Sequence, residues 1–167
     1  MQNINLRPLQ ATDRAVIASL INNKNVWDNL RDYIPFPYSP ENADLFIEFC
    51  QSQSPVLTFG IEFQAQLCGV IGLVPQTDIY RKSAEIGYWI GEHFWGKGIA
   101  SQAIKLMLDY GFEVLDINRI YAGVFVHNLG SIKALEKNGF KKEGLFEKSI
   151  IKNNQFFDEY RLAILKP

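Results

Sequence analysis

The clearest alternation of apolar and polar positions lies between Ala84 and Gly91. One face of this stretch carries apolar side chains, and the other carries Glu85, Trp89 and two glycines, Gly87 and Gly91. A period of two predicts a half-buried β-strand. Because glycine has no side chain, we expect this strand to leave backbone accessible on its second face.

Beyond the strand, the apolar period changes to that of a helix. Apolar residues recur at intervals of three and four from Ala100 to Phe112, which predicts an amphipathic helix. A short loop containing Gly96, Lys97 and Gly98 connects the two elements. A helix start presents unpaired N–H groups and a partial positive charge, and glycines remove the side chains that would keep an anion at a distance. We therefore expect a phosphate or pyrophosphate group to bind at this loop.

The rest of the chain reads as short strands and helices joined by turn-forming residues. Thr12 and Asp13 are predicted to cap the first helix, and Ser39, followed by Pro40, the second. In chain order the predicted elements are a strand at 4–9, a helix through Ile21, an aromatic loop at 27–37, a helix at 40–49, strands at 57–63, 67–74 and 84–91, a helix at 100–112, a strand at 120–126, a helix at 128–138, and hairpin strands at 142–152 and 156–165 joined at Asn153-Asn154.

Glycine loops before helices serve several ligand classes, and the residues of this loop separate them. No Gly-Lys-Ser/Thr closes it, which excludes a Walker loop, and Ser101 stands where a dinucleotide fingerprint has its third glycine. The segment from Trp95 to Ala100, WGKGIA, resembles the pyrophosphate loop of the GNAT acetyltransferases. That family's pattern is Gln or Arg, any two residues, Gly, any residue, then Gly or Ala. Gly98 and Ala100 match it and Trp95 departs from it, while the Trp-Gly-Lys-Gly form is similar to the branch containing the ribosomal-protein N-terminal acetyltransferases RimJ and RimL.

A second motif follows about 30 residues later in the chain. Asn128-Leu-Gly-Ser131 and the segment from Glu136 to Phe140, EKNGF, resemble the family's Asn-x-x-Ser/Ala and Glu-Lys-x-Gly-Phe patterns. Asn128 is also a good helix N-cap, and Asn138-Gly139 is an ordinary helix stop, so both interpretations stay open. The two motifs together make a strand-helix-strand-helix unit of the right size for one parallel crossover.

The order of the predicted elements is the order that the GNAT fold gives. The resemblance covers nearly the whole chain, with specific motifs confined to Glu85–Phe140. It implies an α/β fold with a mixed, mostly antiparallel central sheet, a splayed parallel strand pair and helices on both faces. A single domain over residues 1–167 is expected, because 167 residues of which 47% are hydrophobic can build one substantial core.

Charge, cysteine count and hydropathy exclude several other classes. The net charge of −1 argues against a nucleic-acid partner, since no basic excess exists to displace counterions. Cys50 and Cys68 have neither a Cys-x-x-Cys spacing nor accompanying histidines, so we expect buried thiols and no metal site. The N-terminus lacks a signal-peptide pattern, and no apolar run approaches the ~20 residues of a membrane span. A cytoplasmic protein without a membrane partner is expected, as a monomer or a homodimer.

The resemblance implies transfer of an acetyl group from acetyl-CoA, the cosubstrate, to an amine. Its cofactor-binding residues carry over to the end of the strand, the glycine loop, the first turn of the helix and the second motif. Backbone N–H groups at Trp89 to Gly91 would face the thioester oxygen, unless this is an ordinary, fully paired strand. The implied cofactor-binding set is Trp89, Ile90, Gly91, Trp95, Gly96, Lys97, Gly98, Ile99, Ala100, Ser101 and Asn128.

Two catalytic roles have candidates in the sequence. A protonated amine cannot attack a thioester, so a base must remove a proton, and Glu85 matches the position of a glutamate base in some family members. It is equally well read as a strand-end carboxylate in solvent or paired with Arg81 or Lys82. Many members use a tyrosine seven residues after the asparagine as general acid, but here that residue is Leu135. Ser131 is the nearest replacement by pattern, although it is also an ordinary first-turn residue, and a CoA thiolate can leave without a proton donor.

The acceptor is predicted from the segment between Ala11 and Cys50, which borders the amine's side of the cleft in this fold. Six acidic residues against three basic ones give it a charge of −3, which favours a cationic acceptor. We assign Asp28, Asp32, Tyr33 and Phe36 to acceptor binding, although the aromatic residues of the segment can equally cap the core.

A peptide or protein N-terminus is slightly favoured as the acceptor over a small amine such as a polyamine, an aminoglycoside or an amino acid. Direct transfer in a ternary complex is expected, because the motif region contains no cysteine to serve as a covalent nucleophile. The alternative of another class is a non-catalytic acyl-CoA-binding sensor. Such a sensor would keep the loop and have no use for Glu85 and Ser131.

Overall fold

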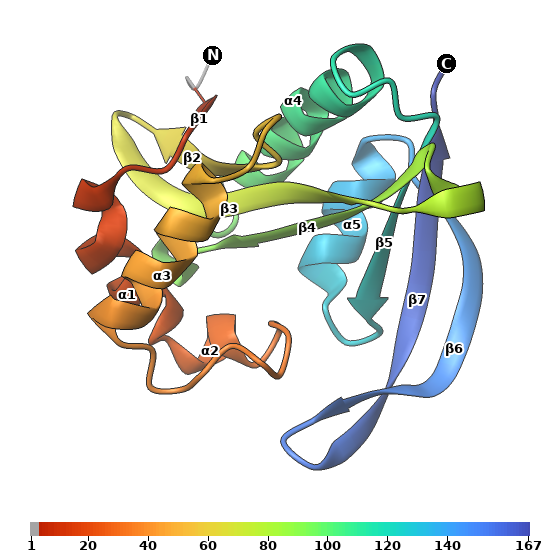
Figure 1. Cartoon of the computed structure of the whole chain (residues 1–167). Coiled ribbons are helices and arrows are strands. Elements are labelled where there is room, and N and C mark those ends of the chain that lie inside the picture. Colours follow the sequence, from red (N-terminus) through yellow and green to blue (C-terminus); the bar gives the residue numbers. More distant parts are fainter. Residues whose placement is uncertain (1–3) are drawn as a thin grey trace. The chain divides into compact units, whose positions relative to one another are not determined.

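The computed structural model describes residues 4–167 and contains one mixed seven-stranded sheet (Figure 1). Residues 1–3, which the predicted single domain and the N-terminal stretch include, lie outside the described residues. The strand order is β1-β2-β3-β4-β5-β7-β6, with β4 and β5 parallel. The strands are β1 (Ile4–Arg7), β2 (Thr58–Phe63), β3 (Gln66–Pro75), β4 (Ser83–Ile90), β5 (Arg119–Phe125), β6 (Lys141–Lys152) and β7 (Gln155–Leu165). The helices are α1 (Arg14–Ile21), α2 (Lys24–Trp27), α3 (Pro40–Gln51), α4 (Ile99–Glu113) and α5 (Leu129–Lys137), with 3-10 turns η1 (Ala11–Asp13), η2 (Asp78–Tyr80) and η3 (Glu92–Phe94). The predicted α/β class with a mixed, mostly antiparallel sheet is confirmed.

Side-chain caps explain where several of the helices begin. Ser39 Oγ accepts a hydrogen bond from the Asn42 N–H at 3.2 Å, so the predicted cap of α3 is confirmed. Helix α2 was not predicted and begins at Asn23, whose side chain accepts from the Asn25 N–H at 2.9 Å. Asp13 occupies the predicted N-cap position of α1, but its carboxylate forms no capping bond there and accepts instead from Arg7 and from the Gln10 N–H at the start of η1.

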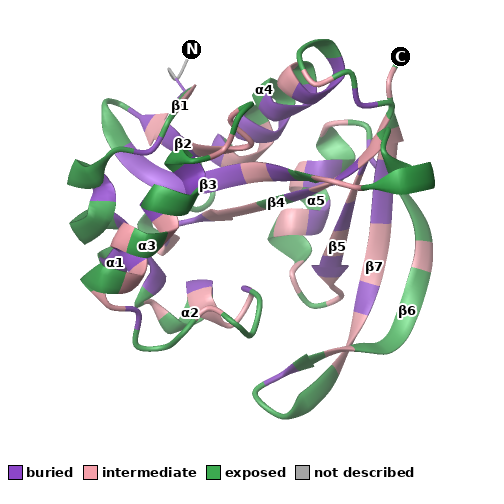
Figure 2. Cartoon of the chain, viewed as in Figure 1, coloured by how far each residue is buried: buried purple, intermediate pink, exposed green. Residues whose placement is uncertain are grey.

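The chain divides into two compact units. The first comprises the described residues up to Gly72 together with Tyr88–Ile99. In this unit α1 and α3 lie side by side, and their inward faces appear purple, as buried residues, in Figure 2. A core cluster here includes Ile17, Ile21, Ala43, Ile47 and Val70, with Trp89 packed against it. Burying these side chains is the main term that holds the helices on this part of the sheet.

The second unit comprises Leu73–Gly87 and the chain from Ala100 onward. Strand β5 pairs along its length with β7, which in turn pairs with β6. Gly111 of α4 lies against Ile120 of β5, and Gly139, at the end of α5, lies near Ile164 of β7. Ile120 and Ile164 are register partners, so both contacts are with the same sheet face.

Two-residue turns connect β2 to β3 and close the predicted hairpin of β6 and β7. Gln64 and Ala65 between β2 and β3 have φ angles of 52° and 61°, and Asn153 and Asn154 between β6 and β7 have 51° and 59°. Positive φ at both central positions is what a tight hairpin turn requires, and asparagine adopts it readily. Strand β6 also contains a bulge, where the register shifts between Phe146 and Ile150.

No helix within 4–167 combines the length and the apolar character needed to cross a bilayer.

Candidate active site

The glycine loop joins η3 at the end of β4 to the start of α4. Gly96 and Gly98 both have φ of +74°, a conformation that side-chain-bearing residues rarely adopt. A Cβ atom at either position would meet nothing within 4 Å, so the space beside the loop backbone is open. The indole N–H of Trp95 donates to the Ile90 carbonyl at 2.7 Å and ties the loop to the end of β4. An exposed glycine backbone directly before a helix start fits the diphosphate of acetyl-CoA.

Lys97, between the two glycines of this loop, contacts the ring of Phe94. Its ammonium group lies 5.4 Å from the centre of the Phe94 ring, within cation–π range. Phe94 is in turn packed edge-on against Phe63 at 6.5 Å. The Phe94 ring, which packs on Phe63, therefore interacts with the positive charge of Lys97 next to the proposed anion site.

The backbone direction at the end of β4 follows from its contacts with β3. The Gly91 N–H donates to the Cys68 carbonyl at 2.8 Å, and the Trp89 carbonyl lies where a side chain on Gly69 would be. Since successive residues of a strand point their polar groups to opposite sides, the N–H of Ile90 points away from β3. Of the three predicted oxyanion donors, Ile90 fits best, and the N–H of Gly91 is already used.

The expectation that both glycines of this strand leave backbone accessible is half right. Gly87 is exposed, and a Cβ atom there would meet nothing within 4 Å. Gly91 is buried, and a Cβ atom would lie 2.6 Å from Leu20. Gly91 therefore permits α1 to pack closely, which is a structural reason for the glycine.

Glu85 lies on β4 where the parallel pairing is formed. The register of this pair is Ser83 with Arg119, Ala84 with Ile120 and Glu85 with Tyr121. Glu85 is half-buried and has an interaction partner, so it is not a carboxylate simply standing in solvent. Glu85 and Tyr121 form the last pair that is described between β4 and β5.

The second motif forms the start of α5. Asn128 Oδ1 accepts from the Ser131 N–H at 3.2 Å, which confirms the N-cap interpretation of Asn128. Ser131 is half-buried in the first turn, as its alternative interpretation requires. Leu135, at the position of the usual tyrosine, is fully buried in the core, so no hydroxyl from this position reaches a ligand.

Asn138 has a role that the sequence interpretation missed. Besides ending α5, its side-chain amide donates to the Ser101 carbonyl at 3.0 Å and to the Ser101 hydroxyl at 3.1 Å. This bond fixes the first turn of α4 to the last turn of α5. The EKNGF motif contains Asn138, but neither its family resemblance nor its helix-stop character indicates a bond to Ser101.

The four residues assigned to the acceptor follow α2, beginning with its C-cap residue Asp28. The carboxylate of Asp28 is bound by Lys24 at 2.6 Å, and the Phe36 ring packs on Trp27 with centroids 5.0 Å apart. Tyr33 is 84% exposed, and Asp32 is exposed with an interaction partner.

The carboxylate of Glu92 in η3 links this segment to the end of β4. It accepts from the side-chain amides of Asn23 and Asn25. These two hydrogen bonds, the one from Asn23 first, lower the pKa of Glu92 below its ordinary value.

Ion pairs reduce the acidic character counted from the sequence. Asp13 forms two bonds of 2.8 Å with Arg7, which lies outside the counted segment, and Arg14 lies 3.2 Å from Asp44. Arg7 therefore changes the net charge of the segment from −3 to −2, while the pairs of Arg14 with Asp44 and of Lys24 with Asp28 leave the net charge unchanged but occupy two of its carboxylates. Charge count alone is therefore a weak guide to the acceptor.

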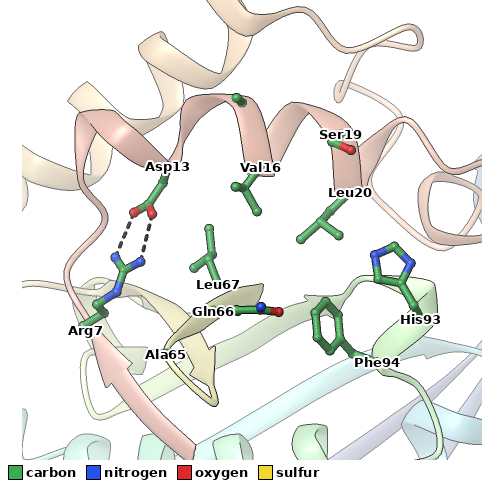
Figure 3. A pocket seen from close by; sticks show the side chains of 11 residues that line it. Arg7, Asp13, Val16, Ser19, Leu20, Ala65, Gln66, Leu67, His93 and Phe94 are labelled. Carbon is green, nitrogen blue, oxygen red and sulfur yellow. Dashed lines mark hydrogen bonds and ion pairs between the residues drawn. The ribbon is translucent and has the colours of Figure 1, made fainter.

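A cavity of about 610 Å³ lies in the first unit, between α1, the β2–β3 turn and η3 (Figure 3). Its wall includes Val16, Leu20 and Phe94, with His93 and Gln66 at its edge. Arg7, which also borders the cavity, binds the carboxylates of Asp13 and Glu62 at 2.8 Å and 2.9 Å. No sequence motif pointed to this cavity.

Comparison with known proteins decides the family. The family model described as acetyltransferase (GNAT) domain matches residues 3–141. The chain belongs to the GNAT acetyltransferase family. This confirms the resemblance drawn from the two motifs, and it is consistent with an acyltransferase that uses acetyl-CoA.

Several relatives share this GNAT domain. "Probable N-acetyltransferase YjcK" of Bacillus subtilis is 44% identical over 112 residues, which cover 65% of this chain and 61% of that protein. Spermidine N(1)-acetyltransferase of Escherichia coli K12 is 31% identical over 166 residues, covering 98% and 87% of the two chains. YdaF of Bacillus subtilis, named as a putative ribosomal N-acetyltransferase, is 30% identical over 172 residues, covering 99% and 92%.

Solved structures agree with this family. Spermidine N-acetyltransferase of Vibrio cholerae, in complex with CoA and spermine, superposes with a TM-score of 0.81 at 28% identity, covering 97% of this GNAT chain and 95% of the other. RimJ of Mycobacterium smegmatis, in complex with CoA-disulfide, gives 0.86 at 23% identity over 97% and 81%, a likeness of fold.

Proposed function

We propose that this chain is an acetyl-CoA-dependent N-acetyltransferase that acts on a primary amine by direct transfer in a ternary complex. The observation that carries the proposal is the exposed loop before α4, with Gly96 and Gly98 both at φ +74°, inside a matched GNAT domain. The loop N–H groups and the first turn of α4 would hold the diphosphate, with Lys97 adding charge.

The chemistry assigned to the chain's residues is proton removal and charge stabilisation. Acetyl-CoA, when bound, supplies the acetyl thioester. Glu85, directly or through water, takes a proton from the ammonium, and the free amine attacks the carbonyl carbon. The C–N bond forms as the C–S bond breaks, and the N–H of Ile90 stabilises the negative charge that develops on the carbonyl oxygen. The CoA sulfur leaves as a thiolate while the nitrogen releases its second proton to water, or the sulfur takes a proton from Ser131, which then regains one from that nitrogen.

The two cysteines support direct transfer rather than a covalent enzyme intermediate. Cys50 and Cys68 are 3% and 0% exposed. Burial raises the pKa of each thiol to about 11, which keeps the reactive thiolate scarce at neutral pH. Neither thiol is therefore suited to accept the acetyl group.

The first acceptor candidate is the N-terminal amine of a peptide. The Trp-Gly-Lys-Gly form of the loop favours it, and YdaF at 30% identity carries a ribosomal name. Spermidine is the second candidate, supported by 31% identity over 166 residues to the Escherichia coli spermidine enzyme. Both present a primary ammonium to the chain.

The test is release of free CoA thiol from acetyl-CoA in the presence of a peptide panel, spermidine and an aminoglycoside. We expect release with at least one amine, with a higher kcat/KM for a peptide than for spermidine. The opposite ranking replaces the peptide with the polyamine. Binding of acetyl-CoA without release for any amine would contradict the enzyme and favour a non-catalytic acyl-CoA sensor.

A further inference from the structure

In the second unit, the contacts described above for α4 and α5 all fall on one face of the sheet, and other residues of β5 belong to the opposite face. Contacts of α4 and α5 fall on the face of Ile120 and Ile164. Side chains alternate along a strand, so Tyr121 and Gly123 of β5 belong to the opposite face. Glu85 is the register partner of Tyr121 in the parallel pair and shares that face.

A buried carboxylate, Glu159 of β7, lies on the same face. It is 9% exposed, and its carboxylate fills the place where a side chain on Gly123 would be, 2.6 Å from the ideal Cβ position. The absence of a side chain at Gly123 therefore brings a carboxylate onto the strand that pairs with β4. Two residues beyond Glu85, Gly87 of β4 is also open, with nothing within 4 Å of its ideal Cβ.

Arg161 holds this carboxylate in place. Its Nη2 donates to Glu159 Oε1 at 3.0 Å, and its guanidinium carbon lies 4.8 Å from the Tyr121 ring centre and 5.2 Å from that of Phe146. These two cation–π contacts restrict the position of the guanidinium. The contact with Glu159 is an ion pair that engages Oε1, and a carboxylate can accept about four hydrogen bonds, so Glu159 can bind a further donor in addition to Arg161.

We propose that Glu159 is a ligand for the ammonium group of the acceptor and determines the enzyme's affinity for it. This inference rests on the proposed function and adds a residue to it. A carboxylate of low exposure, oriented by Arg161 and lying over a glycine on the face of Glu85, binds a primary ammonium by charge-assisted hydrogen bonds. Glu85 then removes the proton, so one carboxylate binds the amine and the other activates it.

The experiment compares Glu159→Gln and Gly123→Ala with the wild type. Glu159→Gln removes the negative charge of the carboxylate. Gly123→Ala keeps the charges of Glu159 and Arg161 but displaces the Glu159 carboxylate, because the alanine Cβ would lie 2.6 Å from that carboxylate. Both variants should raise the acceptor's KM about tenfold or more and leave the KM of acetyl-CoA within twofold. Glu147→Gln, an equal loss of charge at an exposed position of β6, is the matched control and should change neither constant.

Two further measurements keep this inference separate from the proposed function. Thermal unfolding identifies a variant that has merely lost its fold, and calorimetric titration of the CoA complex with spermidine or a tripeptide reports amine binding without turnover. An acceptor KM and amine affinity within twofold of wild type in both variants would overturn the role of Glu159 while leaving the acetyltransferase intact. Absence of thiol release by the wild type would contradict the proposed function, and wild-type amine binding lost on Glu159→Gln would still support the carboxylate as the ligand.

Discussion

Gly98 combines a left-handed backbone with open space, which makes the charge requirement of the loop testable at one residue. Gly98→Asp places a carboxylate where the diphosphate is expected, and we predict at least a roughly hundredfold loss of acetyl-CoA affinity by calorimetry. Gly98→Asn is the matched control, because asparagine has the same shape, tolerates positive φ and carries no charge. An equal loss in both variants would mean that backbone strain, rather than anion binding, explains the effect.

Glu85→Gln tests the base. Removing a proton from an ammonium is hardest at low pH, so turnover should fall most there, by about 10²- to 10⁴-fold, with acetyl-CoA affinity unchanged. A pH–rate profile of kcat is the measurement. Ser131→Ala should cost less, since a thiolate leaves readily, and a larger loss for Ser131 than for Glu85 would reverse the roles.

Single residues show where sequence interpretation works and where it stops. Gly96 and Gly98 were predictable because a loop before a helix requires backbone without side chains. Glu159 was not, since its position depends on Gly123, 36 residues earlier in the chain, leaving a vacancy on the neighbouring strand. The bond from Trp95 to the Ile90 carbonyl was likewise hidden, because local periodicity carries no information about where an indole N–H points.

At the scale of elements, the start of α5 separates a structural role from a cofactor role for Asn128. Asn128→Ala removes the cap on the Ser131 N–H and should lower the free energy of unfolding by about 1 kcal/mol in urea titration. Asn128→Ser keeps a capping oxygen and should restore most of that stability. If acetyl-CoA affinity falls in both variants while stability falls in only one, the amide also contacts the cofactor.

Element types were predictable wherever a strong period and a turn signal coincided. The Asn153-Asn154 hairpin and the Ser39-Pro40 helix start both came from residues with distinct backbone preferences. Helix α2 was not predicted, because four residues are too few to show a period. Its formation depends on the Asn23 cap and on the link to Glu92, a contact 69 residues apart in sequence.

At the scale of the whole chain, Asp13 gives the fold a defined response to acid. Burial alone would raise its pKa, but hydrogen bonds from Arg7 and the Gln10 N–H outweigh burial and lower the pKa below its ordinary value. A carboxyl group whose pKa is lower in the folded state stabilises the fold fully when the pH is above its unfolded-state pKa of about 4. This stabilisation is lost as the pH falls from that value through the folded-state pKa.

The lowered pKa of Asp13 predicts how its substitution changes the stability of the fold with pH. Asp13→Asn should lower the free energy of unfolding by about 2 kcal/mol at pH 7 and flatten its fall between roughly pH 4 and pH 2. Asp28→Asn is the control, because its exposed pair with Lys24 contributes less than about 0.5 kcal/mol. Chemical unfolding at a series of pH values measures both, and a parallel pH profile for wild type and Asp13→Asn would contradict the account.

The bulge in β6 affects how readily this edge strand can pair with a strand of another molecule. This strand ends the sheet order and exposes Leu145, Phe146 and Ile151, a combination that invites a strand from another molecule to add. At the bulge Lys148 has φ of 50° and donates its N–H to Asp158, which bends the edge and interrupts its row of polar groups. A strand arriving from solution meets two short, misaligned segments instead of one long template. We therefore expect the bulge to lower the tendency of β6 to pair with a strand of another molecule.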